Sequence, residues 1–251
     1  METVNLSYCL TFPRVGPLVL SLVLAESSLE LVPNELNNHS AILSWARRKR
    51  KTPAELILDQ TYHHAAILRL PHRGAGRGRP DIIHLSLLLA LGSPLSLEGH
   101  LRCYVHTRDN HLITISPRVR LPRNTDRFVA LVEQLYKERA VPPTGPPLLS
   151  LSKMSLPEIL DKLGADMTVA LTTQGAPRLM ADIAQSMVGY KRPVLLVGAF
   201  PEGHFSNTTL QAADATYRID RRRLEAWTVV ARAVYDFETA ANRSIPATTL
   251  M

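Results

Sequence analysis

Arginine side chains recur in this sequence with the spacing that a phosphate-binding surface requires. Arg79 stands directly before the expected start of a helix. Arg120 and Arg123 flank a Leu-Pro pair, and Arg127 comes one helical turn later. A guanidinium group keeps its charge, and its fork of donors matches the oxygens of a phosphate. The pattern therefore favours the binding of a polyanion.

Asp81, two residues after Arg79, is the carboxylate best placed to act on that arginine. It can hold Arg79 in position through a charge-assisted hydrogen bond. We also consider Asp81 as a catalytic proton acceptor, although pairing with an arginine lowers the basicity of a carboxylate. A carboxylate in the first turn of a helix is favourable by itself, so a purely structural role at the helix start stays open.

Two loops with glycines follow expected strands in the second half of the chain. One is Thr172 to Gly175 (TTQG), and the other is Gly198 to Gly203 (GAFPEG). Ligands of open α/β sheets bind at the carboxyl ends of the strands, and glycine lets the backbone approach a small ligand closely. A turn that only needs a positive φ explains the same glycines. Neither loop matches the dinucleotide fingerprint or the triphosphate-binding loop.

The remaining reactive residue types indicate neither a metal site nor a covalent nucleophile. The histidines show no metal-ligand spacing, and no serine or cysteine has a convincing histidine partner. Cys9 and Cys103 lack a CxxC spacing, so we expect no zinc, no disulfide and a reducing compartment.

The composition is that of a globular, basic protein. The 251 residues include 45% hydrophobic residues and carry a net charge of +7, with a pI of about 9.7. The basic residues gather at 47–51 (RRKRK), 69–79 and 118–127, a distribution typical either of polyanion binding or of a solvated face. The apolar runs are too short for a membrane helix, so we expect a soluble, cytoplasmic protein without membrane contact.

The elements that must position these residues fall into two groups. In the first half the pattern predicts a strand from Leu18 to Leu24, a helix from Pro80 to Leu91, a hairpin over 101–116 and a helix from about Thr125. A proline-rich linker, 141–147 (VPPTGPP), separates this half from the next.

The second half alternates between helix and strand. A capping box at 155–158 opens a helix that ends at Gly164, a strand covers 167–171, and a helix runs from about Pro177 to Val188. Strands at 194–197 and 216–219 follow, and then a long helix whose apolar face includes Trp227, Val230, Ala231, Val234 and Tyr235. Such alternation predicts an α/β fold with a mostly parallel sheet and helices on both faces.

The sequence resembles the pseudouridine N1-specific ribosome-biogenesis methyltransferases of the SPOUT class, in their archaeal form. The resemblance covers nearly all of 18–238. Its most specific motifs are RGRPD at 77–81, VRLPR followed by DRF within 117–134, and GAFPEGHFS at 198–206. Further matching segments are 25–33, 58–59, 63–64, 93–95, 105–107 and 224–227. The cofactor region departs from the family pattern at Glu202, at His204 and in the triplet 221–223 (RRR).

The resemblance implies a SPOUT α/β knot, with a C-terminal trefoil knot and an additional RNA-facing insertion of a β-hairpin and a helix. It implies one domain over 18–240, made of an RNA-facing half (18–140), the linker (141–147) and a cofactor-binding half (148–240). The segments 1–17 and 241–251 are then an N-terminal extension and a C-terminal tail. A homodimer is implied as well.

The implied activity is transfer of a methyl group from S-adenosylmethionine to N1 of a pseudouridine in small-subunit ribosomal RNA, without a metal. The RNA-facing residues carried over are Arg79, Arg120, Arg123 and Arg127, with Asp81 fixing Arg79. The donor would be held by Thr172, Gly175, Gly198, Gly203, Ile219, Asp220, Arg221, Arg222, Arg223 and Leu224. The alternative is a ribosome assembly factor that binds rRNA with the same fold but does not catalyse.

Overall fold

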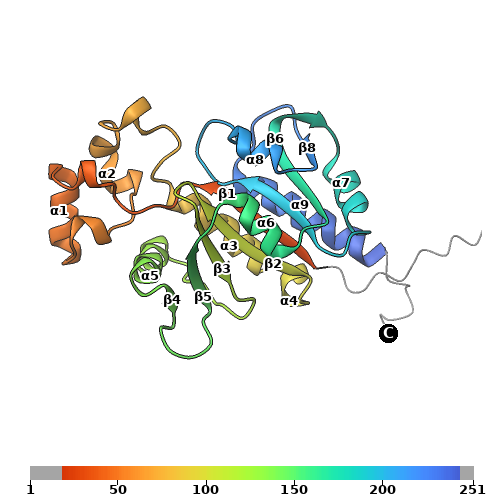
Figure 1. The fold of residues 1–251 in the computed structure, drawn as a ribbon, viewed down its shortest axis with the longest axis horizontal. Coiled ribbons are helices and arrows are strands. Elements are labelled where there is room, and N and C mark those ends of the chain that lie inside the picture. Colours follow the sequence, from red (N-terminus) through yellow and green to blue (C-terminus); the bar gives the residue numbers. More distant parts are fainter. Residues whose placement is uncertain (1–18, 244–251) are drawn as a thin grey trace, which may run out of the picture.

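A single eight-stranded sheet forms the centre of the computed structural model, which describes residues 19–243 (Figure 1). The expected N-terminal extension and the last residues of the expected tail lie outside this range. The strands are β1 (Leu20–Ser27), β2 (Leu101–Thr107), β3 (His111–Ile115), β4 (Ala140–Val141), β5 (Leu149–Lys153), β6 (Met167–Pro177), β7 (Pro193–Gly198) and β8 (Ala215–Arg218).

The sheet has a parallel part and an antiparallel part, in the order β4-β5-β3-β2-β1-β7-β6-β8. Strands β2, β1, β7, β6 and β8 are mutually parallel, so their carboxyl ends share one edge. Strands β3, β5 and β4 continue the sheet in antiparallel pairing. The expected hairpin is present as β2 and β3, and both strands belong to this sheet. The segment 141–147 connects β4 to β5, which also pair with each other.

The helices cover both faces of the sheet. They are α1 (Ser40–Lys49), α2 (Gln60–Ile67), α3 (Pro80–Leu91), α4 (Pro94–Leu97), α5 (Thr125–Glu138), α6 (Leu156–Leu163), α7 (Met180–Met187), α8 (Asn207–Gln211) and α9 (Ala226–Arg243). The bounds expected for α3 are confirmed. The capping box of α6 is also present, and this helix ends at Gly164, whose φ is 60°.

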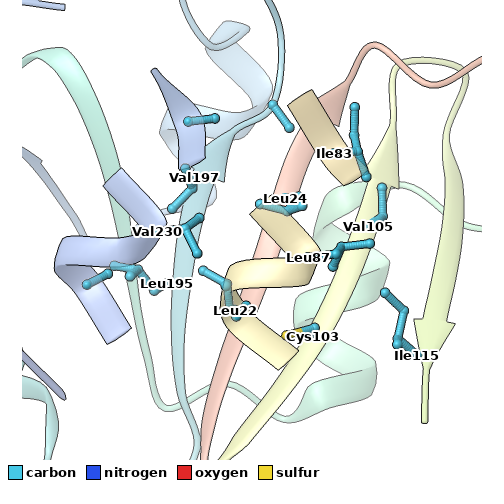
Figure 2. Close-up of a cluster of buried hydrophobic side chains, with 14 of the residues drawn as sticks. Leu22, Leu24, Ile83, Leu87, Cys103, Val105, Ile115, Leu195, Val197 and Val230 are labelled. Carbon is cyan, nitrogen blue, oxygen red and sulfur yellow. The ribbon is translucent and has the colours of Figure 1, made fainter. Parts of the chain in front are cut away.

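Alternation along β1 divides the core between the two faces. Leu22 and Leu24 belong to the cluster that α3, α5, α7 and α9 complete, and Figure 2 shows them beside Leu87 and Val230. Val23 belongs to a second cluster, formed with α6 and with the loop after β7. Helices on both faces, as predicted from the alternating pattern, are therefore confirmed.

Two parts of the second half differ from the predicted elements. Strand β6 continues to Pro177, because after a bulge it pairs again with β8, where Ala176 faces Tyr217. Helix α7 therefore begins only at Met180. Helix α9 begins at Ala226 and buries Val230, Ala233, Val234 and Phe237, whereas Ala231 and Tyr235, expected on its apolar face, are exposed.

Helices α1 and α2 form a small unit with its own hydrophobic cluster, beyond the carboxyl end of β1 (Figure 1). The ammonium group of Lys51 ties this unit to α5, because it lies 2.6 Å from a carboxylate oxygen of the buried Glu133. The second oxygen of Glu133 accepts the backbone N–H of Ile57. Lys51, part of the basic run 47–51, therefore has a structural role within the protein.

A second internal ion pair joins the end of β1 to the chain before α3. The guanidinium group of Arg77 donates to both oxygens of Glu30, at 2.6 Å for its Nη2 and 2.9 Å for its Nε. Glu30 is 8% exposed. Arg77 thus holds the segment that precedes Arg79 close to the chain that follows β1. No helix of residues 19–243 is both long and apolar enough to cross a membrane.

Candidate active site

A cavity of about 360 Å³ lies where the carboxyl ends of β6, β7 and β8 meet the start of α9. All residues expected to hold the methyl donor except Gly175 line it: Thr172, Gly198, Gly203, Ile219, Asp220, Arg221, Arg222, Arg223 and Leu224. Because the strands are parallel, three segments far apart in the sequence deliver these residues to one edge of the sheet.

Apolar side chains that the sequence reasoning did not single out form much of the wall. They are Leu171, Val197, Phe200, Phe205, Tyr217, Ala226 and Val229. The rings of Phe200 and Phe205 meet edge to face, with 5.7 Å between their centroids. Both rings stand in the same loop as Gly203, so this loop supplies an apolar part of the wall. An apolar wall with a few polar groups is typical of small-molecule sites.

The glycines of the two loops have different structural roles. A Cβ on Gly198 would lie 2.8 Å from the ring of Phe200, and Gly203 has a φ of 100°. Both positions therefore require glycine. Gly175 does not line the cavity, contrary to expectation, because it sits against β8, where a Cβ would lie 2.6 Å from backbone atoms of Tyr217. It brings β6 and β8 together behind the cavity.

Charged groups stand at the mouth of the cavity. The carboxylate of Asp220 accepts the backbone N–H and the guanidinium group of Arg222, and these bonds lower the pKa of Asp220 to about 2. Arg232 of α9 also reaches Asp220, at 3.4 Å. Arg223 donates to the carbonyl oxygen of Pro201, which links the segment before α9 to the loop after β7. Arg222 is thus engaged with Asp220, and Arg223 with the loop after β7.

Arg79 and Asp81 form a bidentate pair at the start of α3, as their spacing predicted. Nε of Arg79 lies 2.8 Å from one oxygen of Asp81, and Nη2 lies 2.7 Å from the other. The pair borders an open groove of about 590 Å³, together with Asp59, Tyr62 and Asp126. Both oxygens of Asp81 are engaged, so the carboxylate fixes the direction of the guanidinium group.

Of the three other expected arginines, Arg120 and Arg123 lie between β3 and α5, and Arg127 lies in the first turn of α5. Arg120, Arg123 and Arg127 are exposed, and their side chains form no ion pair within the part of the chain that the structure describes. Unpaired cations of this kind remain free to bind an external anion.

His84 of α3 anchors the arginine segment and was missed by the sequence reasoning. Its Nε2 lies 2.7 Å from the carbonyl oxygen of Pro122, and its Nδ1 lies 3.2 Å from the hydroxyl of Thr125. A carbonyl oxygen only accepts, so Nε2 carries the proton and donates. The ring also stacks on Phe128. No local pattern marks this role, because His84 and Pro122 are 38 residues apart.

Arg79 is connected to the cavity through Ser28. The backbone N–H of Arg79 donates to the carbonyl oxygen of Ser28, at 3.3 Å, and the N–H of Ser28 donates to the carbonyl oxygen of Ala199, at 2.9 Å. Ala199 stands between Gly198 and Phe200, which line the cavity. The bond to Asp81 raises the pKa of Arg79, and the charge of Glu225, which also lines the cavity, contributes in the same direction. Within residues 19–243, no group of three or more His, Cys, Asp or Glu side chains is arranged to hold a metal ion.

Comparison with known proteins gives consistent matches. The family model described as EMG1/NEP1 methyltransferase matches residues 22–238. The protein named "Ribosomal RNA small subunit methyltransferase Nep1" of Thermococcus kodakarensis is 42% identical over 222 residues, which cover 88% of this chain and 99% of that protein. Its namesake in Pyrococcus furiosus is 40% identical over 219 residues, or 87% of this chain and 96% of that protein.

A solved structure agrees with these relatives. The crystal structure of Archaeoglobus fulgidus Nep1 bound to S-adenosylhomocysteine superposes with a TM-score of 0.77 at 29% sequence identity. The match covers 92% of this chain and 100% of the other.

Proposed function

The chain belongs to the EMG1/NEP1 methyltransferase family, and from this premise we propose that it methylates N1 of one pseudouridine in small-subunit ribosomal RNA. At the level of reaction class it is an S-adenosylmethionine-dependent methyltransferase of small-subunit rRNA, like the relatives it matches over nearly their full length. The observation that carries the proposal is that Arg79, fixed by Asp81, is joined by backbone hydrogen bonds through Ser28 to the loop that lines the cavity.

The residues of the cavity fit S-adenosylmethionine. Phe200, Phe205 and Val229 offer apolar surface to a nucleoside, and residues 171–173 of β6 and the loop after β7 bring backbone groups close to it. The absence of a side chain at Gly198 lets the Phe200 ring pack against the end of β7. Asp220, ionised by its bonds to Arg222, adds a fixed negative charge. When bound, the donor supplies an activated methyl group on a sulfonium sulfur.

The protein contributes mainly positioning to this reaction. Arg79, Arg120, Arg123 and Arg127 hold phosphates on either side of the target, so that an unstacked base reaches the cavity. A bond forms between N1 and the methyl carbon while the carbon–sulfur bond breaks, and the N1 proton leaves. Displacement of this kind requires nucleophile and carbon in line, which positioned groups provide.

The proposed target follows from the chemistry of the two uracil nucleosides. The sugar of pseudouridine is attached through carbon, so its N1 carries a hydrogen and is free to accept a methyl group. In uridine the glycosidic bond occupies N1. We therefore propose that the enzyme distinguishes pseudouridine from uridine without a separate binding site that excludes uridine.

A pair of matched RNA hairpins tests this proposal. We expect labelled methyl transfer to a hairpin from small-subunit rRNA that contains pseudouridine, and no transfer to the same hairpin with uridine. Mass spectrometry of the nucleosides should locate the methyl group on N1. Equal labelling of both hairpins would disprove the pseudouridine specificity while leaving the methyltransferase class intact.

Replacement of Asp81 by asparagine tests its proposed roles. Asp81→Asn keeps the shape but removes the charge that orients Arg79, so we expect the KM for RNA to rise about tenfold through loss of a charge-assisted bond. If Asp81 also accepts the N1 proton, kcat falls as well, by about 100-fold or more. Steady-state kinetics separates the two roles. If folded Asp81→Asn had normal turnover and a normal KM for RNA, both proposed roles of Asp81 would be excluded.

Two finer features of the architecture are also proposals. We infer a trefoil knot formed by the chain between β8 and α9. Two observations support it. Residues 219–225 line the same cavity as the end of β6 and the loop after β7. Arg223 also donates a hydrogen bond to the carbonyl oxygen of Pro201 in that loop.

We further infer a homodimer. It is supported by exposed apolar residues on the helices α3 and α9, which pack against each other, namely Leu85, Leu89 and Tyr235. With rRNA as substrate, the proposed location is the cytoplasm.

A further inference from the structure

The basic run at 47–51 is divided by the structure into an internal and an external part. Lys51 is bound to the buried Glu133. Arg47 and Arg48, in the last turn of α1, are exposed and form no ion pair within residues 19–243. The sequence contains no Asp or Glu between Glu35 and Glu55. This end of α1 therefore presents positive charge without local compensation.

Two cations of this run, Arg48 and Lys49, lie on an aromatic base. The rings of Trp45 and Tyr62 stack with 3.7 Å between their centroids and 15° between their planes. The guanidinium carbon of Arg48 lies 5.2 Å from the Trp45 ring, and the ammonium group of Lys49 lies 4.9 Å from it. Contacts of this kind restrict the side chains while leaving their charge in solvent.

The same aromatic base connects α1 to the arginine surface near the cavity. Tyr62 lines the groove that Arg79 and Asp81 border. Its hydroxyl donates to Asp126, at 2.9 Å, in the first turn of α5 and next to Arg127. The α1–α2 unit lies beyond the carboxyl end of β1, the edge at which the loops of the cavity also lie (Figure 1).

We propose that Arg47 and Arg48, the second of which packs on Trp45, form a second phosphate-binding surface that holds the RNA strand flanking the target nucleotide. Tyr62 and Asp126 lie between this surface and Arg127. This inference rests on the proposed function, because it requires an RNA substrate. Basic residues at a helix C-terminus also interact favourably with the helix dipole. That interaction affects the stability of the helix and not the affinity for RNA.

The experiment measures how salt weakens RNA binding. The probe is a fragment of the small-subunit rRNA of Thermococcus kodakarensis that contains pseudouridine at the target position, bound by the full chain over a range of salt concentrations. Each phosphate contact contributes about 0.7 to 0.9 to the slope of log K against log salt. For Arg47→Gln/Arg48→Gln we expect a slope shallower by about 1.4 to 1.8, and loss of backbone protection on one flank of the methylated site.

A matched control removes two charges from the opposite edge of the sheet. Lys162 and Lys191 are exposed and lie just before β6 and β7, where the strands begin. Lys162→Gln/Lys191→Gln should leave the slope and the protected region as in the wild type. Thermal unfolding of both variants shows whether a change in α1 stability contributes.

Each outcome decides one question. A wild-type slope in Arg47→Gln/Arg48→Gln, with the protected region unchanged, overturns the second surface while the methyltransferase proposal stands. An equal loss in both double variants also overturns it, because the effect is then one of net charge. Wild-type protein that neither binds nor methylates the pseudouridine-containing fragment contradicts the proposed function itself, and the second surface with it.

Discussion

Glu30→Ala is expected to lower the free energy of unfolding by about 3 kcal/mol, measured by chemical denaturation. Glu30 is 8% exposed, and both of its oxygens accept hydrogen bonds from Arg77. The ordinary pKa of a guanidinium group is so high that Arg77 stays charged after its partner is removed. A largely buried, unpaired cation is the source of the expected loss.

A double variant and a surface variant separate this effect from the loss of side-chain contacts. In Glu30→Leu/Arg77→Leu no charge remains unpaired, so we expect a smaller loss than in Glu30→Ala. Lys137→Ala removes an exposed pair with Glu55 at 3.7 Å and should cost about 0–1 kcal/mol. If Glu30→Ala were as stable as the wild type, Arg77 would not be the group that holds the chain before α3.

Gly175→Ala is expected to weaken donor binding at least tenfold, although Gly175 does not touch the donor cavity. The added Cβ would meet the backbone of Tyr217 at 2.6 Å, and backbone atoms cannot turn aside as a flexible side chain can. Strands β6 and β8 must therefore separate, at a cost of about 1–3 kcal/mol in stability. Tyr217 and the residues after it line the cavity, so their displacement changes its wall.

Calorimetry with S-adenosylhomocysteine measures this effect, and Gly189 provides the matched control. A Cβ on Gly189, in the loop before β7, would meet no atom within 4 Å. Gly189→Ala should therefore bind the ligand as the wild type does, with unchanged or slightly higher stability. Wild-type affinity in folded Gly175→Ala would show that the spacing of β6 and β8 does not control the cavity.

Features set by neighbouring residues were predictable from the sequence. Helix α3 has its expected bounds because Pro80 begins it and Gly92 follows its end, both of which are local effects. The pairing of Arg79 with Asp81 depends on a separation of two residues. The cavity at the carboxyl ends of β6, β7 and β8 lies where glycines that directly follow strands, together with the family resemblance, pointed.

Features that depend on distant partners were not predictable. Strand β6 extends to Pro177 because β8, some 40 residues later, offers a second pairing segment after the bulge. Lys51 and Glu133 are 82 residues apart. The run RRKRK alone therefore does not show that Lys51 forms an internal ion pair while its neighbours face solvent. The face of α9 was misassigned at Ala231 and Tyr235 because a helical repeat of apolar residues does not show where the core ends.

The ties between α1, α2, α3 and α5 have a kinetic consequence. Lys51 binds Glu133, Tyr62 binds Asp126, and His84 binds Pro122, so the basic surfaces are joined to one framework in the absence of RNA. No ordering step then has to accompany the encounter. We therefore expect the association rate to be governed by long-range attraction between a basic protein and its polyanion, and to fall steeply as salt screens that attraction.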